Sequence, residues 1–162
     1  MSADILKAGT PIDISFTLNG KPVSAAVMAE TTLSSLLRDS HGLNGVKIAC
    51  ASAVCGSCTA LVDGKSVTTC SAFAYQADGR EIVTVEGLAK DGDPNAVQQA
   101  FINKSAFQCG YCTPGMILLA TALLAENPKP TRDEVIAWMS ANICRCTGYT
   151  LIVEAVMEAS GQ

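Results

Sequence analysis

Hydrophobic and polar positions alternate along the first part of the chain. Between residues 12 and 18 every second residue is hydrophobic and those between are polar, which is the period of a strand with one buried face. Asn19-Gly20 follows, a strong signal for a two-residue hairpin turn. Residues 21–27 are therefore expected to form the returning strand, and residues 32–38, with leucines on one face, a short helix.

Three more short strands are expected before residue 88. Residues 59–62 and 66–69 flank a second turn signal at Asp63-Gly64, and residues 81–85 form a last strand. The first half of the chain is thus predicted to be one small helix lying across a mostly antiparallel sheet.

The second half has a helical pattern. Helices are expected at 96–104, 115–126 and 151–159, and a further one follows Thr131, which forms a capping box with Glu134. The stretch 88–95 is rich in Gly, Asp and Pro and marks a boundary. The pattern predicts an α+β chain with two domains, residues 1–87 and 88–162.

Composition points to a protein that is partly covered by others. The 162 residues are 49% hydrophobic and 16% charged, below the about 25% charged residues of a typical soluble domain. Partner proteins would cover the apolar surface that so few charged residues leave. An unusually apolar monomer remains the alternative. The net charge is −4 and no Lys/Arg cluster stands out, so no nucleic-acid partner is expected.

The chain carries eight cysteines and shows no targeting segment. Residues 1–16 lack the apolar core of a secretory signal, and the longest apolar run, 116–125, is shorter than the roughly 20 residues that span a bilayer. A cytoplasmic protein is therefore expected, with no membrane span. In that reducing compartment eight cysteines indicate metal or redox chemistry rather than disulfides.

The first four cysteines have the spacing of a plant-type [2Fe–2S] site. A Cys-x4-Cys-x2-Cys run is followed by one distant cysteine, and the set is Cys50, Cys55, Cys58 and Cys70. A loop wrapped around two bridged irons must bring its backbone N–H groups close to the sulphurs. The residues between the first three cysteines are nearly all small, which permits that approach.

The other four cysteines form two pairs ahead of two predicted helices: Cys109 with Cys112, and Cys144 with Cys146. An oxidised cluster together with its four thiolates carries a net charge of about −2. Helix N-termini favour such a charge by about 0.3–1 kcal/mol each near a surface. For this set alone a zinc site remains an alternative, but the spacing of the first set is unusual for zinc.

At these residues the chain resembles the small iron–sulphur subunit of the molybdenum hydroxylases, the xanthine oxidase family. The resemblance covers about residues 12–157, and its most specific segments are 108–115 and 142–149. It implies an N-terminal plant-ferredoxin-like β-grasp domain followed by a C-terminal four-helix [2Fe–2S] domain. No catalytic residue for substrate is expected in this chain, so it would be an enzyme only as one subunit of an oxidoreductase complex.

The resemblance also implies the cofactors and partners of the complex. Two [2Fe–2S] clusters would lie in this chain, a molybdopterin cofactor in a large subunit and FAD in a medium subunit, in a dimer of heterotrimers. Electrons would pass from molybdenum through the second cysteine set to the first set and then to FAD. Gln108 and Cys146 would contact the pterin. The alternatives left open are a free two-cluster ferredoxin-type carrier and a zinc-stabilised interaction module.

Three positions depart from the family pattern. Ala49, Ala53 and Ala141 stand where the family often has glycine. Alanine tolerates a positive φ poorly, so the loop at Ala53 is expected to have a somewhat different shape. The sequence of this chain is not expected to identify the substrate. Bacterial members of the family that act on N-heteroaromatic compounds resemble it.

Overall fold

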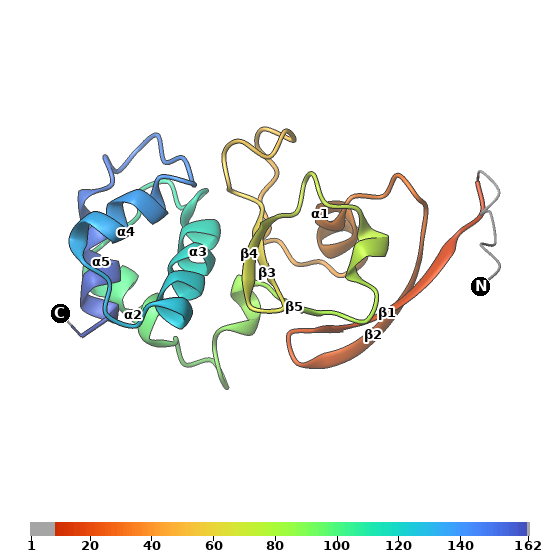
Figure 1. The fold of residues 1–162 in the computed structure, drawn as a ribbon, viewed down its shortest axis with the longest axis horizontal. Coiled ribbons are helices and arrows are strands. Elements are labelled where there is room, and N and C mark those ends of the chain that lie inside the picture. The colour runs from red at the N-terminus through yellow and green to blue at the C-terminus, as the bar shows by residue number, and fades with distance from the viewer. Residues whose placement is uncertain (1–8, 162) are drawn as a thin grey trace.

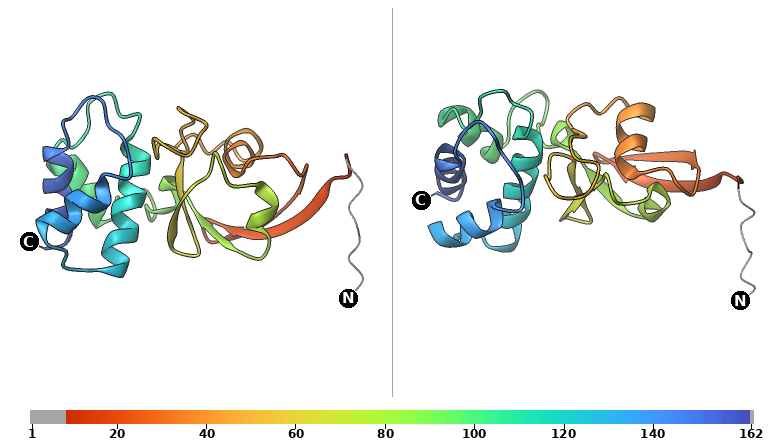
Figure 2. Two further views of the ribbon diagram at one scale, coloured as in Figure 1. Left: turned by 45° about the horizontal axis from the view of Figure 1, so that its top comes forward. Right: turned by 90° about the horizontal axis from the view of Figure 1, so that it is seen from above.

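A computed structural model describes residues 9–161 of the chain. A sheet half and a helical half lie side by side, with the N-terminus at the sheet end and the C-terminus at the helical end (Figure 1). Figure 2 gives the same arrangement from two further directions. Residues 1–8 and 162, at the outer ends of the two predicted domains, lie outside the described residues.

The sheet has five strands in the order β2-β1-β5-β3-β4. Neighbouring strands are antiparallel, except that β1 and β5 run parallel, so the predicted mostly antiparallel sheet is confirmed. This mixed order is that of a β-grasp. The strands are β1 (Ile12–Leu18), β2 (Lys21–Val27), β3 (Thr59–Val62), β4 (Lys65–Thr68) and β5 (Glu81–Val83).

One helical segment packs on the sheet, as predicted. It begins as α1 (Leu33–Ser35), whose N-cap Thr32 accepts a hydrogen bond from the amide of Ser35, and continues as the π-helical turn η1 (Leu36–Ser40). Its three leucines are buried in the core of this half. The π-helical widening was not predicted.

Two short 3-10 helices were also missed: η2 (Ala74–Ala77) and η3 (Val85–Gly87). The strand predicted over 81–85 ends at Val83, because the chain turns into η3 at Val85. Single turns of this length carry almost no periodic signal in a sequence.

The helical half contains the four predicted helices around one core. Where a range was expected, the starts and ends agree within two residues, and the predicted capping box at Thr131 is formed. A second capping box, at Asn95, was not predicted. Met116, Val135 and Ile152 are fully buried between them. The helices are α2 (Ala96–Asn103), α3 (Thr113–Glu126), α4 (Arg132–Met139) and α5 (Thr150–Ala159).

Helix α3 joins the two halves. Its residues Leu118 and Ala122 form a small buried cluster with Leu61 of β3. Trp138 packs against this cluster, and its indole nitrogen donates to the carbonyl of Leu119 at 3.1 Å. Trp138 and the apolar stretch of α3 are thus packing residues, and they hold the sheet half and the helical half against each other.

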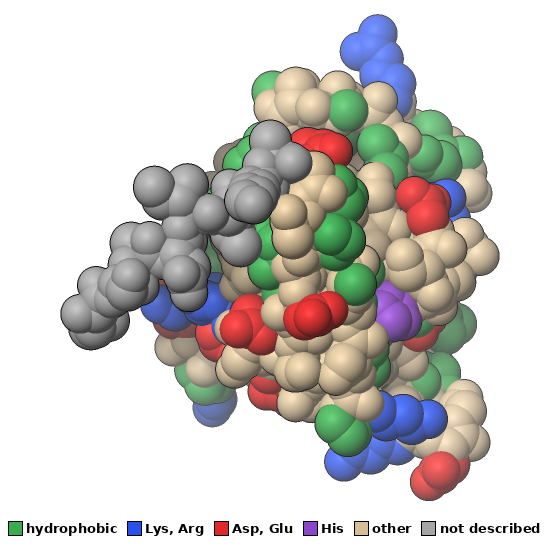
Figure 3. All heavy atoms as spheres, turned by 90° about the vertical axis from the view of Figure 1, so that its right-hand side faces the viewer, with side chains coloured by type: hydrophobic (Ala, Val, Ile, Leu, Met, Phe, Trp, Pro, Cys, Tyr) green, Lys and Arg blue, Asp and Glu red, His purple; other side chains and the backbone are tan. Residues whose placement is uncertain are grey.

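The surface has charges of both signs, scattered without a large patch of one sign over the sheet end (Figure 3). Within residues 9–161 no helix has the length and hydrophobicity to cross a bilayer. His41 is half-buried, with its ring edge-on to Phe16 at 6.0 Å between centroids.

Candidate metal centres

The first three cysteines lie on an irregular loop that leads into β3. Cys58 is buried, whereas Cys50 and Cys55 are partly exposed. The amides of Ser52 and Cys55 each lie 3.4 Å from the Cys50 sulphur and donate to it. The loop therefore turns its N–H groups toward a thiol, as the small residues along it were expected to permit.

The alanines of this loop adopt a conformation that usually favours glycine. Ala51 has φ of 51° and Ala53 has φ of 61°, in the left-handed region that costs L-residues roughly 1–2 kcal/mol each. The expected change of loop shape rested on alanine avoiding this region, whereas here Ala53 takes up the left-handed conformation itself.

Within the first set the thiols are arranged in two pairs. Cys50 is adjacent to Cys55, which hydrogen-bonds to it, and Cys58 is adjacent to Cys70, whose amide donates to the Cys58 sulphur at 3.4 Å. Cys70 follows β4, and its neighbour Thr69 donates from its hydroxyl to the Cys58 carbonyl at 2.7 Å. The end of β4 thus holds the distant cysteine against the loop.

The second set is assembled from two loops of the helical half. The sulphurs of Cys109 and Cys146 lie 3.5 Å apart, and Cys112 interacts with Cys144. Each pair takes one thiol from the loop before α3 and one from the loop before α5. Two thiolates on one tetrahedral metal atom, each about 2.3 Å from it, lie about 3.8 Å apart, close to the Cys109–Cys146 separation.

The loop before α5 is organised around Cys144. The Cys144 amide donates to the hydroxyl of Tyr149 at 2.8 Å, and the Thr147 hydroxyl donates to the Cys144 sulphur at 3.1 Å. Tyr149 caps α5 in the left-handed region, with φ of 68°. Because α5 begins only at Thr150, four residues after Cys146, its N-terminus is not directly at the thiols.

Helix α3 does start at the second set. Cys112 is its N-cap and Pro114 stands in its first turn, so the free N–H groups of this turn begin at a ligand candidate. Of the two helix N-termini expected beside this set, α3 therefore meets the expectation and α5 is set back.

The environments of the thiols differ. Hydrogen bonds, first from the side chain of Ser52 and then from the Cys55 amide, lower the pKa of Cys50 to about 5. Burial raises the pKa of Cys58 to about 11 and that of Cys112 to about 12. For Cys144 burial opposes ionisation, but hydrogen bonds from Thr147 outweigh it and its pKa falls. The contact with Cys109 raises the pKa of Cys146.

This donor set fits a two-iron cluster better than a single ion. Within the described part of the chain, no three His, Cys, Asp or Glu side chains gather closely enough to hold one metal ion. The thiols instead form two pairs in each set, and a [2Fe–2S] cluster needs two thiolates on each of two irons. All eight cysteines are free, so none is consumed by a disulfide.

Gln108 lies at the outer end of the second set. It is exposed, as are its neighbour Cys109 and the paired Cys146. Phe107 beside it is 42% exposed. This end of the helical half is therefore open to a partner, with Gln108 next to two thiols of the second set.

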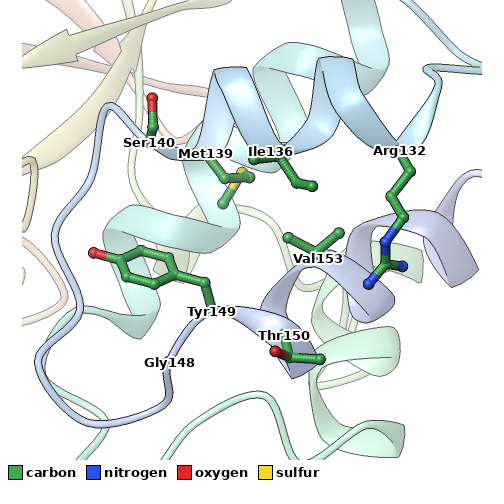
Figure 4. Close-up of a pocket in the computed structure, with 8 residues that line it drawn as sticks. All are labelled: Arg132, Ile136, Met139, Ser140, Gly148, Tyr149, Thr150 and Val153. Carbon is green, nitrogen blue, oxygen red and sulfur yellow. The ribbon is translucent and has the colours of Figure 1, made fainter.

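A hollow of about 500 Å³ lies between α4 and α5 (Figure 4). Arg132, Ile136 and Met139 line it from α4, and Val153 lines it from α5. Tyr149 forms the wall toward the cysteine loops, since its hydroxyl accepts from the Cys144 amide. No carboxylate lines the hollow, so the pairs of acidic groups used in acid–base chemistry are not found at this place.

Sequence reasoning missed the contacts between the two cysteine sets. The Ile143 amide donates to the Cys55 carbonyl at 2.9 Å, and the Tyr111 hydroxyl donates to the Ile48 carbonyl at 2.9 Å. The side chain of Asn142 is buried between the loops, 3% exposed. Cysteine spacing carries no signal for such contacts. The only sequence hint is that Asn142 is the first residue of 142–149, one of the two most specific segments.

Comparison with known proteins agrees with the paired-thiol geometry. Residues 16–89 match the family model of a 2Fe-2S iron-sulfur cluster binding domain, and residues 84–157 match that of a [2Fe-2S] binding domain. The chain therefore carries two [2Fe–2S] clusters.

Relatives of known function match over almost their whole length. The nicotine 6-hydroxylase small subunit of Paenarthrobacter nicotinovorans is 48% identical over 151 residues, which cover 93% of this chain and 91% of that protein. The nicotinate dehydrogenase small FeS subunit of Eubacterium barkeri is 49% identical over 148 residues, which cover 91% of this chain and 94% of that protein.

A solved structure has the same fold. A chain of quinoline 2-oxidoreductase from Pseudomonas putida 86 superposes with a TM-score of 0.90 at 47% identity, and the match covers 94% of each chain. With its fold, its two cluster-binding domains and these relatives, the chain belongs to the small [2Fe–2S] subunits of the molybdenum hydroxylase, or xanthine oxidase, family.

Proposed function

We propose that this chain carries electrons within a molybdenum hydroxylase, from a molybdopterin cofactor in a large subunit to FAD in a medium subunit. The observation that carries the proposal is the grouping of eight free thiols into two sets of two pairs. The relatives named above are small subunits, which supports a role as one part of a larger oxidoreductase rather than as a free carrier.

The proposed ligands follow the thiol pairs. In the first site Cys50 and Cys55 would hold one iron, and Cys58 and Cys70 the other. When bound, each cluster takes up and passes on one electron. The loop amides that point at the Cys50 sulphur would stabilise the negative charge that the thiolate carries in either state.

The second site would be shared between two loops. Cys109 and Cys146 would hold one iron, and Cys112 and Cys144 the other. Because each iron would then bridge the loop before α3 and the loop before α5, cluster binding would tie the two halves of the helix bundle together. The free N–H groups at the start of α3 favour the charge of this cluster.

The exposed end of the second set is the proposed contact with the molybdenum subunit. Cys109 and Cys146 are exposed there, and Phe107, two residues before Cys109, is 42% exposed. Exposed apolar groups around a charged site are typical of a surface that a partner covers. The Gln108 side chain would form a hydrogen bond with the pterin at this contact.

The first set is the proposed contact with the flavin subunit. Its loop carries Val54, which is 64% exposed, and Cys50 and Cys55 are partly exposed beside it. Electrons would thus enter at the helical half and leave at the sheet half. The division of the chain into residues 1–87 and 88–162 is part of this proposal, since each part would hold one cluster.

The substrate of the complex is proposed to be an N-heteroaromatic compound. The relatives described above are named for nicotine, nicotinate and quinoline, which are all nitrogen heterocycles. The complex is proposed to be a dimer of heterotrimers in the cytoplasm, where eight unpaired thiols are ordinary.

Purification of the protein from its native source tests the proposal. The chain is expected to co-purify with a larger subunit that contains molybdopterin and with a second subunit that contains FAD. Addition of an N-heteroaromatic substrate should then bleach the cluster absorbance. Purification as a lone chain, with neither subunit in proportion, would contradict the proposed role.

A further inference from the structure

The side chain of Asn142 fills a space between the two cysteine-bearing loops. Gly56 follows Cys55 in the first set, and a Cβ atom at Gly56 would overlap the Asn142 amide oxygen. Gly115 of α3 closes the space from below, because a Cβ atom there would lie 2.6 Å from the Gly56 carbonyl oxygen and 3.2 Å from Asn142 Nδ2. Three elements therefore meet at this one amide.

Asn142 lies close to cysteines of both sets, through a contact of its side chain and through its neighbours in the chain. Its amide oxygen lies 3.5 Å from the hydroxyl of Thr59, which directly follows Cys58. The next residue, Ile143, donates its N–H to the Cys55 carbonyl at 2.9 Å, and the residue after that is Cys144. Cys55 of the first set is thus linked by one hydrogen bond to Ile143, which is next to Cys144 of the second set.

A polar residue at this position needs an explanation. The Asn142 amide nitrogen is buried and has no hydrogen-bond partner within the described residues, and such a group costs free energy. A small apolar residue would avoid that cost. The amide is retained at a place where both cysteine loops converge, which points to a role in how those loops are held.

We propose that Asn142 is a positioning residue that holds the Cys55 loop against the Cys144 loop and so fixes the separation of the two clusters. The proposal rests on the ligand assignment of the proposed function. Electron transfer slows steeply with distance, and the Ile143–Cys55 hydrogen bond joins Cys55 of the first set to the residue next to Cys144 of the second set. Shortening Asn142 removes the side chain that keeps this link closed, without removing a ligand.

The test uses the purified complex with Asn142→Ala and, as a milder change, Asn142→Ser. Asn103→Ala is the matched control, because Asn103 is an exposed asparagine whose amide bonds to Glu158, outside the contact. The first measurement is the magnetic splitting between the two clusters in the EPR spectrum of the fully reduced protein. The second is hydrogen exchange, by mass spectrometry, of the peptide that contains Ile143.

Both Asn142 variants are expected to keep the iron of two clusters and to lose part of the splitting. Exchange at the Ile143 peptide should become about tenfold faster, which corresponds to about 1.4 kcal/mol, and the control should match the unchanged protein. Loaded variants with unchanged splitting and exchange would overturn the proposal. Loss of a cluster in both variants would also overturn it, since Asn142 would then serve assembly. Absence of a cluster from the unchanged protein would instead refute the proposed function.

Discussion

The amide of Ile143 donates a 2.9 Å hydrogen bond to the carbonyl oxygen of Cys55, across the boundary between the helical half and the sheet half. Cys55 belongs to the first cysteine set, and Ile143 directly precedes Cys144 of the second. The two candidate metal centres are therefore neighbours in space, although they lie far apart in the chain. They are separate sites whose loops are in contact.

Each cluster should be removable without the other. Cys55→Ser is expected to lower the iron content by about half and to abolish one EPR signal, because its set lies in the sheet half. Cys112→Ser should abolish the other signal, because its ligands lie in the helical half. Loss of both signals from a folded single variant would show that the quartets are wrongly assigned.

Gln108 should act on electron entry and not on cluster assembly. Gln108→Ala is expected to leave both clusters loaded, since the side chain is exposed and is not a thiol. Reduction of the clusters by substrate should slow by about tenfold or more, as for other groups that support a metal site from outside. Gln99→Ala, in the exposed face of α2, is the control, and equal rates in the two variants would remove Gln108 from the site.

Replacement of the left-handed alanine of the first loop by glycine should stabilise the protein. Ala53 has φ of 61°, so Ala53→Gly relieves strain, and we expect a gain of about 0.5–1 kcal/mol after the greater freedom of glycine in the unfolded chain is counted. The urea concentration at which the cluster absorbance disappears should rise. Ala60→Gly, in the buried strand β3, should lower it, and a fall for both variants would contradict the strain argument.

Cysteine reactivity in the cluster-free chain should follow the thiol environments. With its pKa lowered to about 5, Cys50 is a thiolate at pH 7, whereas Cys58 and Cys112, raised to about 11 and 12, are protonated. Between pH 6 and 8 alkylation of Cys50 should be fast and nearly independent of pH. Alkylation of the other two should be slow and rise about tenfold per pH unit. Equal rates for all three would contradict this order.

The sequence predicted most of the fold because its elements are strongly patterned. Alternation from Ile12 to Leu18 and the Asn19-Gly20 turn specified the first hairpin, and the Thr131 capping box specified the start of α4. The short turns η2 and η3 were missed, since three or four residues are too few for a period to appear. The packing of His41 on Phe16 depends on tertiary contacts, for which a local pattern carries no signal.

The candidate centres were predictable as groups of cysteines but not as geometry. Spacing separated the first quartet from the second, yet the pairing of Cys109 with Cys146 depends on how two loops fold toward each other. The left-handed conformation of Ala53 was not expected, because alanine disfavours it and the surrounding loop imposes it. Asn142 had no signal beyond its place before Cys144, since its role arises from packing against Gly56 and Gly115.

Chemical analysis of the freshly purified, anaerobic protein tests the central claim most directly. With two [2Fe–2S] clusters per chain, iron and acid-labile sulphide should each be present at about four atoms per chain, and dithionite reduction should produce two distinct EPR signals. Zinc in place of iron, or iron without labile sulphide, would contradict the account.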